Sequence, residues 1–242
     1  MSTNILILAA GQSGFDNHDG GYPLSLSELE GVSLLERIVK NTAGIPDARY
    51  VFALLDKEIE SYHLDRVAIL LAPGALIVRI PESTKGSACT ALLAASQVSP
   101  EDPLLIVSAN ELVDLDLALA LRDFEERGLD AGTLIFRSVH PRYSYVMLSK
   151  DGLVTQVAQK KPITQRATAG IFWFKRTSDF VEAAKNTISK CATVDGKFYV
   201  APTFNELILK QKAIGVYEIA NEKYLPLKTE RQLYQFEHGS QH

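Results

Sequence analysis

The sequence predicts an α/β fold, a three-layer α/β/α sandwich built around a mixed, mostly parallel sheet. In the first half of the chain, short aliphatic runs alternate with amphipathic segments, a pattern typical of parallel strands joined by helices. After Gly132 the β runs follow one another closely, which indicates antiparallel strands added to that core. With 242 residues and 46% apolar content, the chain can bury one sizeable core.

The first half supplies the expected parallel strands and the helices between them. Aliphatic and β-branched runs predict strands over residues 5–8, 50–54, 68–71, 76–80 and 104–107. Helical spacing of apolar residues predicts helices over 34–42, 57–64, 87–96 and 117–127. We expect Gly128 to stop the last of these helices and Asp116 to cap its start.

The second half mixes strands with further helices. Strands are predicted over 133–137, 145–148, 154–157, 169–174 and 214–219, and helices over 178–189, 202–210 and 230–236. Alternation places Phe172 and Phe174 on one face of their strand and Trp173 on the other. Because no linker or composition shift divides the chain, we expect one domain over residues 1–237, followed by a short flexible tail at 238–242.

Composition excludes several function classes. A net charge of −4 and a pI near 5.8 give no electrostatic basis for binding nucleic acid or a membrane surface. We find no export signal and no apolar run of the roughly 20 residues that a spanning helix needs, so we expect a cytoplasmic protein. Cys89 and Cys191 are too few for a disulfide framework and are expected to be buried, reduced thiols.

A glycine-containing loop follows the first strand and reads Leu8-Ala9-Ala10-Gly11-Gln12-Ser13-Gly14. Glycines let backbone N–H groups approach a triphosphate closely, because they present no Cβ in the way. The loop predicts a nucleotide site made by Ala10, Gly11, Gln12, Ser13 and Gly14. By itself, the same pattern also fits an ordinary turn of small residues at the end of a strand.

Two further motifs follow in order. Lys85, Gly86 and Ser87 form a glycine turn that opens a helix, where a flat base can lie against backbone and the helix N-terminus supplies donors. The third motif is Gln159-Lys160-Lys161-Pro162, followed by the strand that contains Gly170. Lys85, Lys160 and Lys161 are candidate anion contacts, although loop lysines are often only solvated.

In this order and spacing, the three motifs resemble those of the sugar-phosphate nucleotidyltransferases, the pyrophosphorylases with a glycosyltransferase-A-like Rossmann core. The resemblance extends over most of the chain, from Ile5 to Phe236. It implies transfer of a nucleotidyl group from a nucleoside triphosphate to a sugar 1-phosphate, which supplies surface-polysaccharide precursors. It also implies Mg2+ as cofactor and substrate contacts from Asn110, Glu111, Lys160, Lys161, Gly170 and Asn205.

The charged groups of that family are replaced here. Its phosphate-facing Arg falls at Gly14 or Phe15, and its Pro-Lys pair reads Pro23-Leu24. Its metal-binding Asp after the strand at 104–107 becomes Asn110, and its second metal carboxylate falls at Pro226. The acid of its Glu-Lys-Pro motif becomes Gln159. Glu111 or Asp114 could replace the missing metal ligand, since Mg2+ prefers carboxylates.

Three hypotheses follow for function, and the sequence designates no catalytic residue. The first is an active nucleotidyltransferase that uses Glu111 or Asp114 as its metal ligand, although we expect its catalysis to be weak or lost, because phosphoryl chemistry depends on the missing charges. The second is a pseudoenzyme that binds a nucleotide, a sugar nucleotide or a partner enzyme. The third, more distant, is a glycosyltransferase that uses Asp114 and Asp116, which have Asp-x-Asp spacing. Arg142 and Arg166 are possible replacement cations that the sequence does not place, and the chain could form a homo-oligomer.

Overall fold

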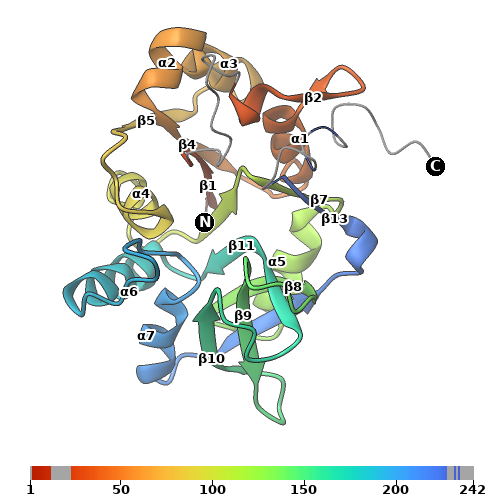
Figure 1. The fold of residues 1–242 in the computed structure, drawn as a ribbon, viewed down its shortest axis with the longest axis vertical. Coiled ribbons are helices and arrows are strands. Elements are labelled where there is room, and N and C mark those ends of the chain that lie inside the picture. The colour runs from red at the N-terminus through yellow and green to blue at the C-terminus, as the bar shows by residue number, and fades with distance from the viewer. Residues whose placement is uncertain (1, 12–22, 228–231, 233, 235–242) are drawn as a thin grey trace.

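A nine-stranded mixed sheet runs through the molecule (Figure 1). The structure is a computed structural model that describes residues 2–11, 23–227, 232 and 234. Seven strands follow in the order β10-β9-β11-β6-β1-β4-β5, while β8 pairs with both β11 and β12. The described part of the chain therefore confirms the predicted mixed α/β sheet. The expected single domain over 1–237 stays a prediction, and the tail at 238–242 lies outside the described residues.

Four parallel strands form one half of the sheet. Strand β1 (Asn4–Ala9) lies between β4 (Arg49–Leu55) and β6 (Leu104–Ser108), and β5 (Leu76–Ile80) pairs with the far side of β4. Because the strands are parallel, their carboxyl ends meet at one edge of the sheet. The segments that follow them are therefore brought together at that edge.

Antiparallel pairing builds the other half. Strand β11 (Arg166–Phe174) pairs with β6, with β8 (Ala131–Arg137) and with β9 (Ser144–Leu148). Strand β10 (Val154–Gln159) forms a hairpin with β9, and β12 (Ile214–Glu218) runs parallel to β8. The register of β11 against β8 shifts between Thr168 and Phe172. This irregularity bends β11 at Gly170, next to the parallel strand ends.

Helices cover both faces of the sheet, which confirms the three-layer architecture. On one face lie α1 (Leu34–Asn41), α2 (Asp56–Tyr62), α3 (Leu64–Leu71) and α5 (Leu117–Glu126), and on the other α4 (Ser87–Ala95), α6 (Thr177–Ser189) and α7 (Thr203–Leu209) (Figure 1). Successive strand residues point alternately into the two hydrophobic cores, one on each face of the sheet. Ile5 and Trp173 lie in the first core, whereas Leu6, Phe172 and Phe174 lie in the second.

Two short β pairs and two 3-10 turns lie beside the main sheet. A hairpin joins β2 (Glu28–Leu29) to β3 (Val32–Ser33), shortly after the turn η1 (Leu24–Leu26). Strand β7 (Glu111–Val113) pairs antiparallel with β13 (Tyr224–Pro226), which follows the turn η2 (Asn221–Lys223). The β7–β13 pair joins the segment after β6 to a segment more than 100 residues later in the chain.

Most predicted elements are present, and two predictions were wrong. Residues 68–71 form no strand, because they belong to α3, where Leu64 and Ala68 point inward with helical spacing and Leu70 is exposed. The helix predicted over 57–64 is broken at His63, whose left-handed φ of 52° separates α2 from α3. A third prediction, that both cysteines are buried, was also wrong: both are free, but Cys89 is only half-buried and Cys191 is exposed.

The boundaries of α5 agree with the sequence. Asp116 accepts a hydrogen bond from the backbone N–H of Ala118 at 3.0 Å, as expected for an N-cap. Gly128 follows the helix with a φ of 65°, and the N–H of the next residue, Leu129, donates to the carbonyl of Phe124. The helix therefore ends in a Schellman motif. Most of the helix predicted over 230–236 lies outside the described residues. No helix in the described ranges is both long and apolar enough to span a membrane.

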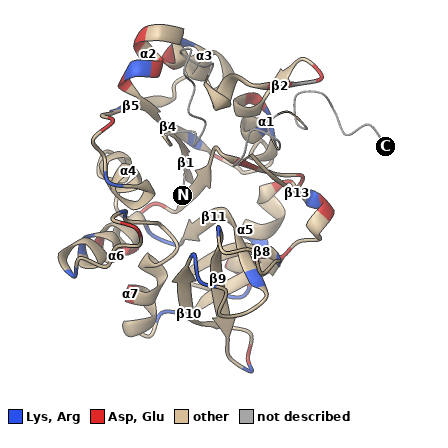
Figure 2. Ribbon diagram, viewed as in Figure 1, with Lys and Arg blue, Asp and Glu red and all other residues tan. Residues whose placement is uncertain are grey.

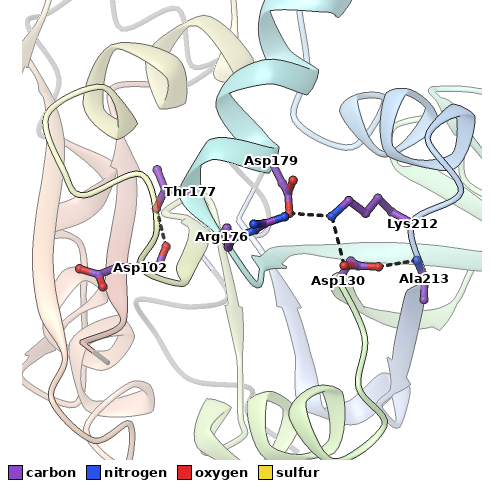
Figure 3. A network of polar contacts seen from close by, with 7 residues as sticks. All are labelled: Asp102, Asp130, Arg176, Thr177, Asp179, Lys212 and Ala213. Carbon is purple, nitrogen blue, oxygen red and sulfur yellow. Dashed lines mark hydrogen bonds and ion pairs between the residues drawn. The ribbon is translucent and has the colours of Figure 1, made fainter.

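A polar network ties the second half of the sheet to its helices (Figure 3). Lys212 Nζ, just before β12, lies 3.3 Å from Asp130 Oδ1 and 3.4 Å from Asp179 Oδ2 on α6. Asp130 also accepts a hydrogen bond from the backbone N–H of Ala213 at 2.9 Å. One ammonium group thus joins three segments, and the Asp179 side chain is only 12% exposed.

Replacing Lys212 by Met is expected to destabilise the fold. The substitution keeps most of the aliphatic side chain but leaves the Asp130 carboxylate without a cation and Asp179 with Arg176 alone. We expect the free energy of unfolding in urea to fall by about 1–2 kcal/mol. The matched control is Lys40→Met, which removes an exposed i,i+4 pair with Glu36 and should cost about 0.3–0.5 kcal/mol. Equal losses in the two variants would contradict this role.

Candidate functional site

A cavity of about 520 Å³ opens at the carboxyl ends of the parallel strands. The end of β1, the start of α2 and the loop between β5 and α4 line one end of it. The segment after β6, the ends of β9 and β10 and the bend of β11 line the other end. The loop at 195–201 also lines the cavity and connects the two ends, because Phe198 hydrogen-bonds to the turn at residues 85–88. The cavity therefore lies where a doubly wound α/β sheet is expected to bind its ligand.

The structure brings most of the predicted site residues to this one cavity. Its lining includes Ala10, Gly11, Lys85, Gly86, Ser87, Asn110, Glu111, Lys160 and Gly170. Gln12, Ser13 and Gly14 lie outside the described residues. Leu24, which stands where the resembling family has a lysine, also lines the cavity. The binding roles of all these residues stay predictions.

Three other predicted residues are placed elsewhere. Asp114, Lys161 and Asn205 are not among the residues that line the cavity. Asn205 on α7 exchanges two hydrogen bonds with the backbone of Val157, each 2.9 Å long, so its amide fastens α7 to β10. Asp116, the partner of Asp114 in the Asp-x-Asp pair, caps α5. The geometry thus gives these residues structural roles or solvent positions rather than a place in the cavity.

The two glycine turns differ in what surrounds them. A Cβ on Gly11 would have no atom within 4 Å, so space for a ligand remains beside it. Gly86 has a φ of 100°, and a Cβ there would lie 2.4 Å from the carbonyl oxygen of Phe198. The backbone of Phe198 bonds on both sides of this turn, to the Lys85 carbonyl and the Ala88 N–H. Close packing against the chain itself therefore requires glycine at position 86.

The positions that correspond to the two metal carboxylates face one another across the β7–β13 pair. Pro226 lies opposite Glu111 in the register, and Leu227 N–H donates to the Asn110 carbonyl at 3.0 Å. The Asn110 amide oxygen accepts a hydrogen bond from Ser108 Oγ at 3.0 Å. The chain thus brings the two positions together but supplies an amide and a proline ring, neither of which is a carboxylate ligand.

Glu111 is buried and already engaged. Its side chain accepts a hydrogen bond from the Tyr224 hydroxyl, and the residue is only 5% exposed. Burial, aided by the Glu111 charge, raises the pKa of Tyr224 well above its ordinary value, so this hydroxyl remains a neutral donor. A Cβ on Gly170, whose φ is 69°, would lie 1.9 Å from Glu111 Oε1. Gly170 is thus required to make room for the Glu111 carboxylate.

These residues do not fit a magnesium site. Mg2+ takes oxygen ligands in near-octahedral geometry and is usually held by one or two carboxylates. Within the described ranges, no three His, Cys, Asp or Glu side chains come together as metal ligands. Glu111 is held by Tyr224, and Asp114 lies away from the cavity. The prediction that either carboxylate replaces the missing ligand gains no support from their positions.

Several cations line the cavity. Lys160 Nζ pairs with Asp195 at 2.7 Å and lies 5.5 Å from the centre of the Tyr199 ring, and its hydrogen bond to Asp195 raises its pKa. Arg142 also lines the cavity, and Lys197 lies beside Gly86 of the β5–α4 loop. The sequence analysis named Arg142 as a possible cation without a location and did not identify Lys197. Both residues are brought to the cavity by antiparallel strands and loops, whose positions local sequence patterns do not predict.

Two carboxyl groups at the β4 and β5 end were also missed. Glu58 on α2 and Glu82 after β5 both line the cavity. Among the described residues, the Glu58 Oε2 atom is buried without a hydrogen-bond partner, and burial raises the pKa of Glu58 to about 7 although nearby Lys57 opposes the shift. Figure 2 shows acidic and basic residues interspersed along the ribbon, and the same holds here, because Lys57 adjoins Glu58 and Lys85 lies three positions after Glu82. Glu58 and Glu82 follow parallel strands in the sequence, and this position was the signal from which they could have been predicted to line the site.

Comparison with known proteins shows the fold. No family model and no curated protein matches the sequence. A nucleoside-diphosphate-sugar pyrophosphorylase from Vibrio cholerae RC9 matches with a TM-score of 0.80 at 19% identity, over 97% of this chain and 99% of that one. The chain has the fold of the sugar nucleotidyltransferases.

Two further solved structures agree. A UDP-glucose pyrophosphorylase in complex with UDP-glucose matches with a TM-score of 0.76 at 14% identity, over 98% of both chains. A protein assigned as a glucose-1-phosphate thymidylyltransferase from Bacillus anthracis, in complex with sucrose, gives 0.71 at 15% identity, over 98% of this chain and 94% of that one. The nucleotidyltransferase-type fold predicted from the motifs is therefore confirmed.

Glu58 should make stability depend on pH. A glutamate titrates near 4.5 in the unfolded chain and near 7 here, so between these values the folded state binds more protons and stability falls as pH rises. The Glu58→Gln variant has no carboxyl group that titrates here, so this loss of stability with rising pH is removed. Because Glu58 is partly exposed, we expect the variant to gain only about 1–2 kcal/mol over the native protein between pH 5 and pH 8.

Urea unfolding at both pH values measures this gain. The control is Glu60→Gln on the same helix, where an exposed carboxylate pairs with Arg79. Its difference from the native protein should change little with pH. A Glu58→Gln difference that is equally flat would show that this carboxyl group titrates normally.

Proposed function

We propose that this chain binds a nucleotide together with a sugar phosphate in the cavity, and that its nucleotidyl transfer is weak or lost. The observation that carries the proposal is the β7–β13 pair. It juxtaposes the two positions where the resembling family holds its metal, and fills them with Asn110 and Pro226. The scaffold for two substrates is thus retained, while the ligands that would serve their reaction are absent from the described residues.

Binding has support from several groups. The open space beside Gly11 suits the close approach of phosphates to backbone. Lys85, Arg142, Lys160 and Lys197 all line the cavity and can contact phosphate oxygens. Lys85 and Lys197 make no ion pair within the described ranges, whereas Lys160 must exchange Asp195 for a ligand. The two structural neighbours solved with UDP-glucose and sucrose are similar in fold, which supports a small-molecule site.

Fast transfer has much weaker support. Nucleotidyl transfer joins two polyanions, so it needs counter-charge that is positioned before the reaction begins. Loss of one such stabilising contact costs an enzyme about 10²–10³ in rate. Leu24 and Asn110 are neutral, and Pro226 carries no ligand atom on its side chain. Cationic Arg142 and Lys197 help to bind phosphate, but neither can hold Mg2+.

A binding role without turnover is the main alternative within this proposal. The same cavity could hold a nucleotide or sugar nucleotide whose binding is sensed by a partner enzyme or by a second copy of the chain. We do not propose the glycosyltransferase function, because Asp116 caps α5 and neither Asp114 nor Asp116 lines the cavity. A place in surface-polysaccharide precursor synthesis and a cytoplasmic location stay predictions.

The first test separates binding from transfer. We expect calorimetry to detect binding of nucleoside triphosphates or sugar nucleotides, since the glycine loop and cations remain. Pyrophosphate release from a panel of triphosphates and sugar 1-phosphates with Mg2+ should be at least 10³-fold slower than the roughly 10 s⁻¹ typical of enzymes. Turnover near 10 s⁻¹ would contradict lost catalysis, and absence of binding to every ligand would contradict the proposal as a whole.

The second test restores the missing groups. We expect the combined variant Leu24→Lys, Asn110→Asp and Pro226→Asp to raise magnesium-dependent pyrophosphate release by at least about 10²-fold, because it returns one cation and one carboxylate to the cavity lining and a second carboxylate opposite Glu111. Asp114→Asn serves as the control, since Asp114 lies away from the cavity and should leave the rate unchanged. No increase in a folded, nucleotide-binding triple variant would show that charge loss is not the reason for slow transfer.

A further inference from the structure

We propose that this chain has a second ligand site, which binds a small organic anion with an apolar, ring-containing body. A cavity of about 490 Å³ lies at the amino ends of the parallel strands, because Thr3, Pro46 and Pro103, which line it, shortly precede β1, β4 and β6. It is large enough for a small molecule. No described residue lines both this second cavity and the cavity at the carboxyl ends. The inference therefore goes beyond the proposed nucleotide site and does not depend on it.

One face of α5 forms a wall of the second cavity. Four of its residues line the cavity at intervals of three and four positions, which is the spacing of a single helix face: Ala118, Leu121, Arg122 and Glu125. Ala118 and Leu121 are buried, whereas Arg122 and Glu125 are exposed. The wall is therefore apolar where it meets the sheet and charged where it meets solvent.

The sheet supplies an aromatic wall. Trp173 on β11 lines the second cavity and is only 1% exposed, and Ile45 and Leu129, which also line it, are buried. Among the described residues, the indole Nε1 of Trp173 is buried and has no hydrogen-bond acceptor. A buried donor without an acceptor is costly and rare in native proteins. An oxygen of a ligand that packs against the Trp173 ring would supply the acceptor.

Two cations at the solvent side of the second cavity favour an anion. Arg122 and Lys175 line it, both are exposed, and neither makes an ion pair within the described ranges. Glu125 also lines it, so the lining carries two cations against one carboxylate. A ligand carboxylate can accept charge-assisted hydrogen bonds from either cation while its body packs against the apolar walls. The lining therefore favours a ligand with one negative charge over a neutral or cationic ligand of the same shape.

Acidic groups that adjoin the lining do not reverse this preference. Asp102 pairs with Arg49 at 4.0 Å, and Asp130 belongs to the polar network of Figure 3. Asp47 and Glu101 are exposed and do not line the cavity. Water and salt screen such exposed charges, so direct contacts with the lining residues decide which ligand binds.

The test uses phenylbutyrate, which joins a phenyl ring to a carboxylate, and compares it with phenylbutanol and phenylbutylamine, which end in a neutral and a cationic group. Trp173 is the single tryptophan of the chain, so tryptophan fluorescence and the one indole N–H signal in NMR spectra report on this cavity. We expect phenylbutyrate to change both signals in a saturable way, with a dissociation constant on the order of 1 mM. It should bind at least about threefold more tightly than phenylbutanol, and phenylbutylamine should bind most weakly.

Arg122 and Glu125 provide matched variants of opposite sign. Both side chains are exposed on the same face of α5, so neither substitution should disturb folding. We expect Arg122→Gln to weaken phenylbutyrate binding by about two- to fivefold and Glu125→Gln to strengthen it by a similar factor. The control is Arg142→Gln, which changes a residue of the cavity at the carboxyl ends and should keep the native affinity.

Three results would overturn the inference. The first is an indole N–H signal of Trp173 that does not move with phenylbutyrate. The second is binding of phenylbutylamine as tight as that of phenylbutyrate, and the third is an equal effect of Arg122→Gln and Glu125→Gln. Each result leaves the proposed nucleotide binding intact, because that function is measured with other ligands in the other cavity.

Discussion

Four parallel strands end at one edge of the sheet, and the arrangement of the candidate site depends on that constraint. Backbone hydrogen bonding fixes β1 between β4 and β6, with β5 beyond β4, so the segments after them meet without any specific contact between side chains. The second half of the sheet, added antiparallel along β6, brings β9, β10 and β11 against the same edge. A cavity for two ligands is a consequence of this order of strands.

Beside that cavity, the β7–β13 pair shows most clearly that the fold of the resembling family is kept while its metal-binding carboxylates are not. The pair holds Asn110 beside the Tyr224–Leu227 segment with the regularity of any β ladder. Glu111 is buried beneath Tyr224, in the space that Gly170 leaves, and its carboxyl group accepts a hydrogen bond from the Tyr224 hydroxyl. Without opposing metal charge, a carboxylate in this place needs such a donor, because an unpaired buried charge is expensive. The local structure is thus consistent with a site specialised for binding.

The balance of charge in the cavity supports the same view. The resembling family aligns its reactants with metal and basic side chains, whereas in this cavity basic and acidic side chains are mixed, with Lys85 three positions after Glu82. Lys160 is already paired with Asp195, which lowers the net positive potential available to phosphates. The cavity thus keeps cations that can contact an anion, while the family's two metal carboxylates are replaced by Asn110 and Pro226.

Much of the fold followed from local patterns. Alternation gave the two faces of the β11 strand, and Asp116 and Gly128 marked the ends of α5, because caps and strand periodicity are local properties. The apolar run at 68–71 was misread as a strand, since a short apolar run fits either helix or strand until packing selects one. The β7–β13 pair could not be predicted, because its strands have three residues each and lie more than 100 positions apart.

The sequence by itself determined the fold class, the glycine turns at Gly11 and Gly86, and the replacement of carboxylates at Asn110 and Pro226. Only the tertiary structure decided that Pro226 lies opposite Glu111, next to Asn110, that Glu111 is held by Tyr224, and that Glu58 lines the cavity. Residue types and short-range periodicity can be read directly from the sequence. Juxtaposition, burial and the sharing of hydrogen bonds arise when distant segments pack, because each depends on what the neighbouring segment supplies.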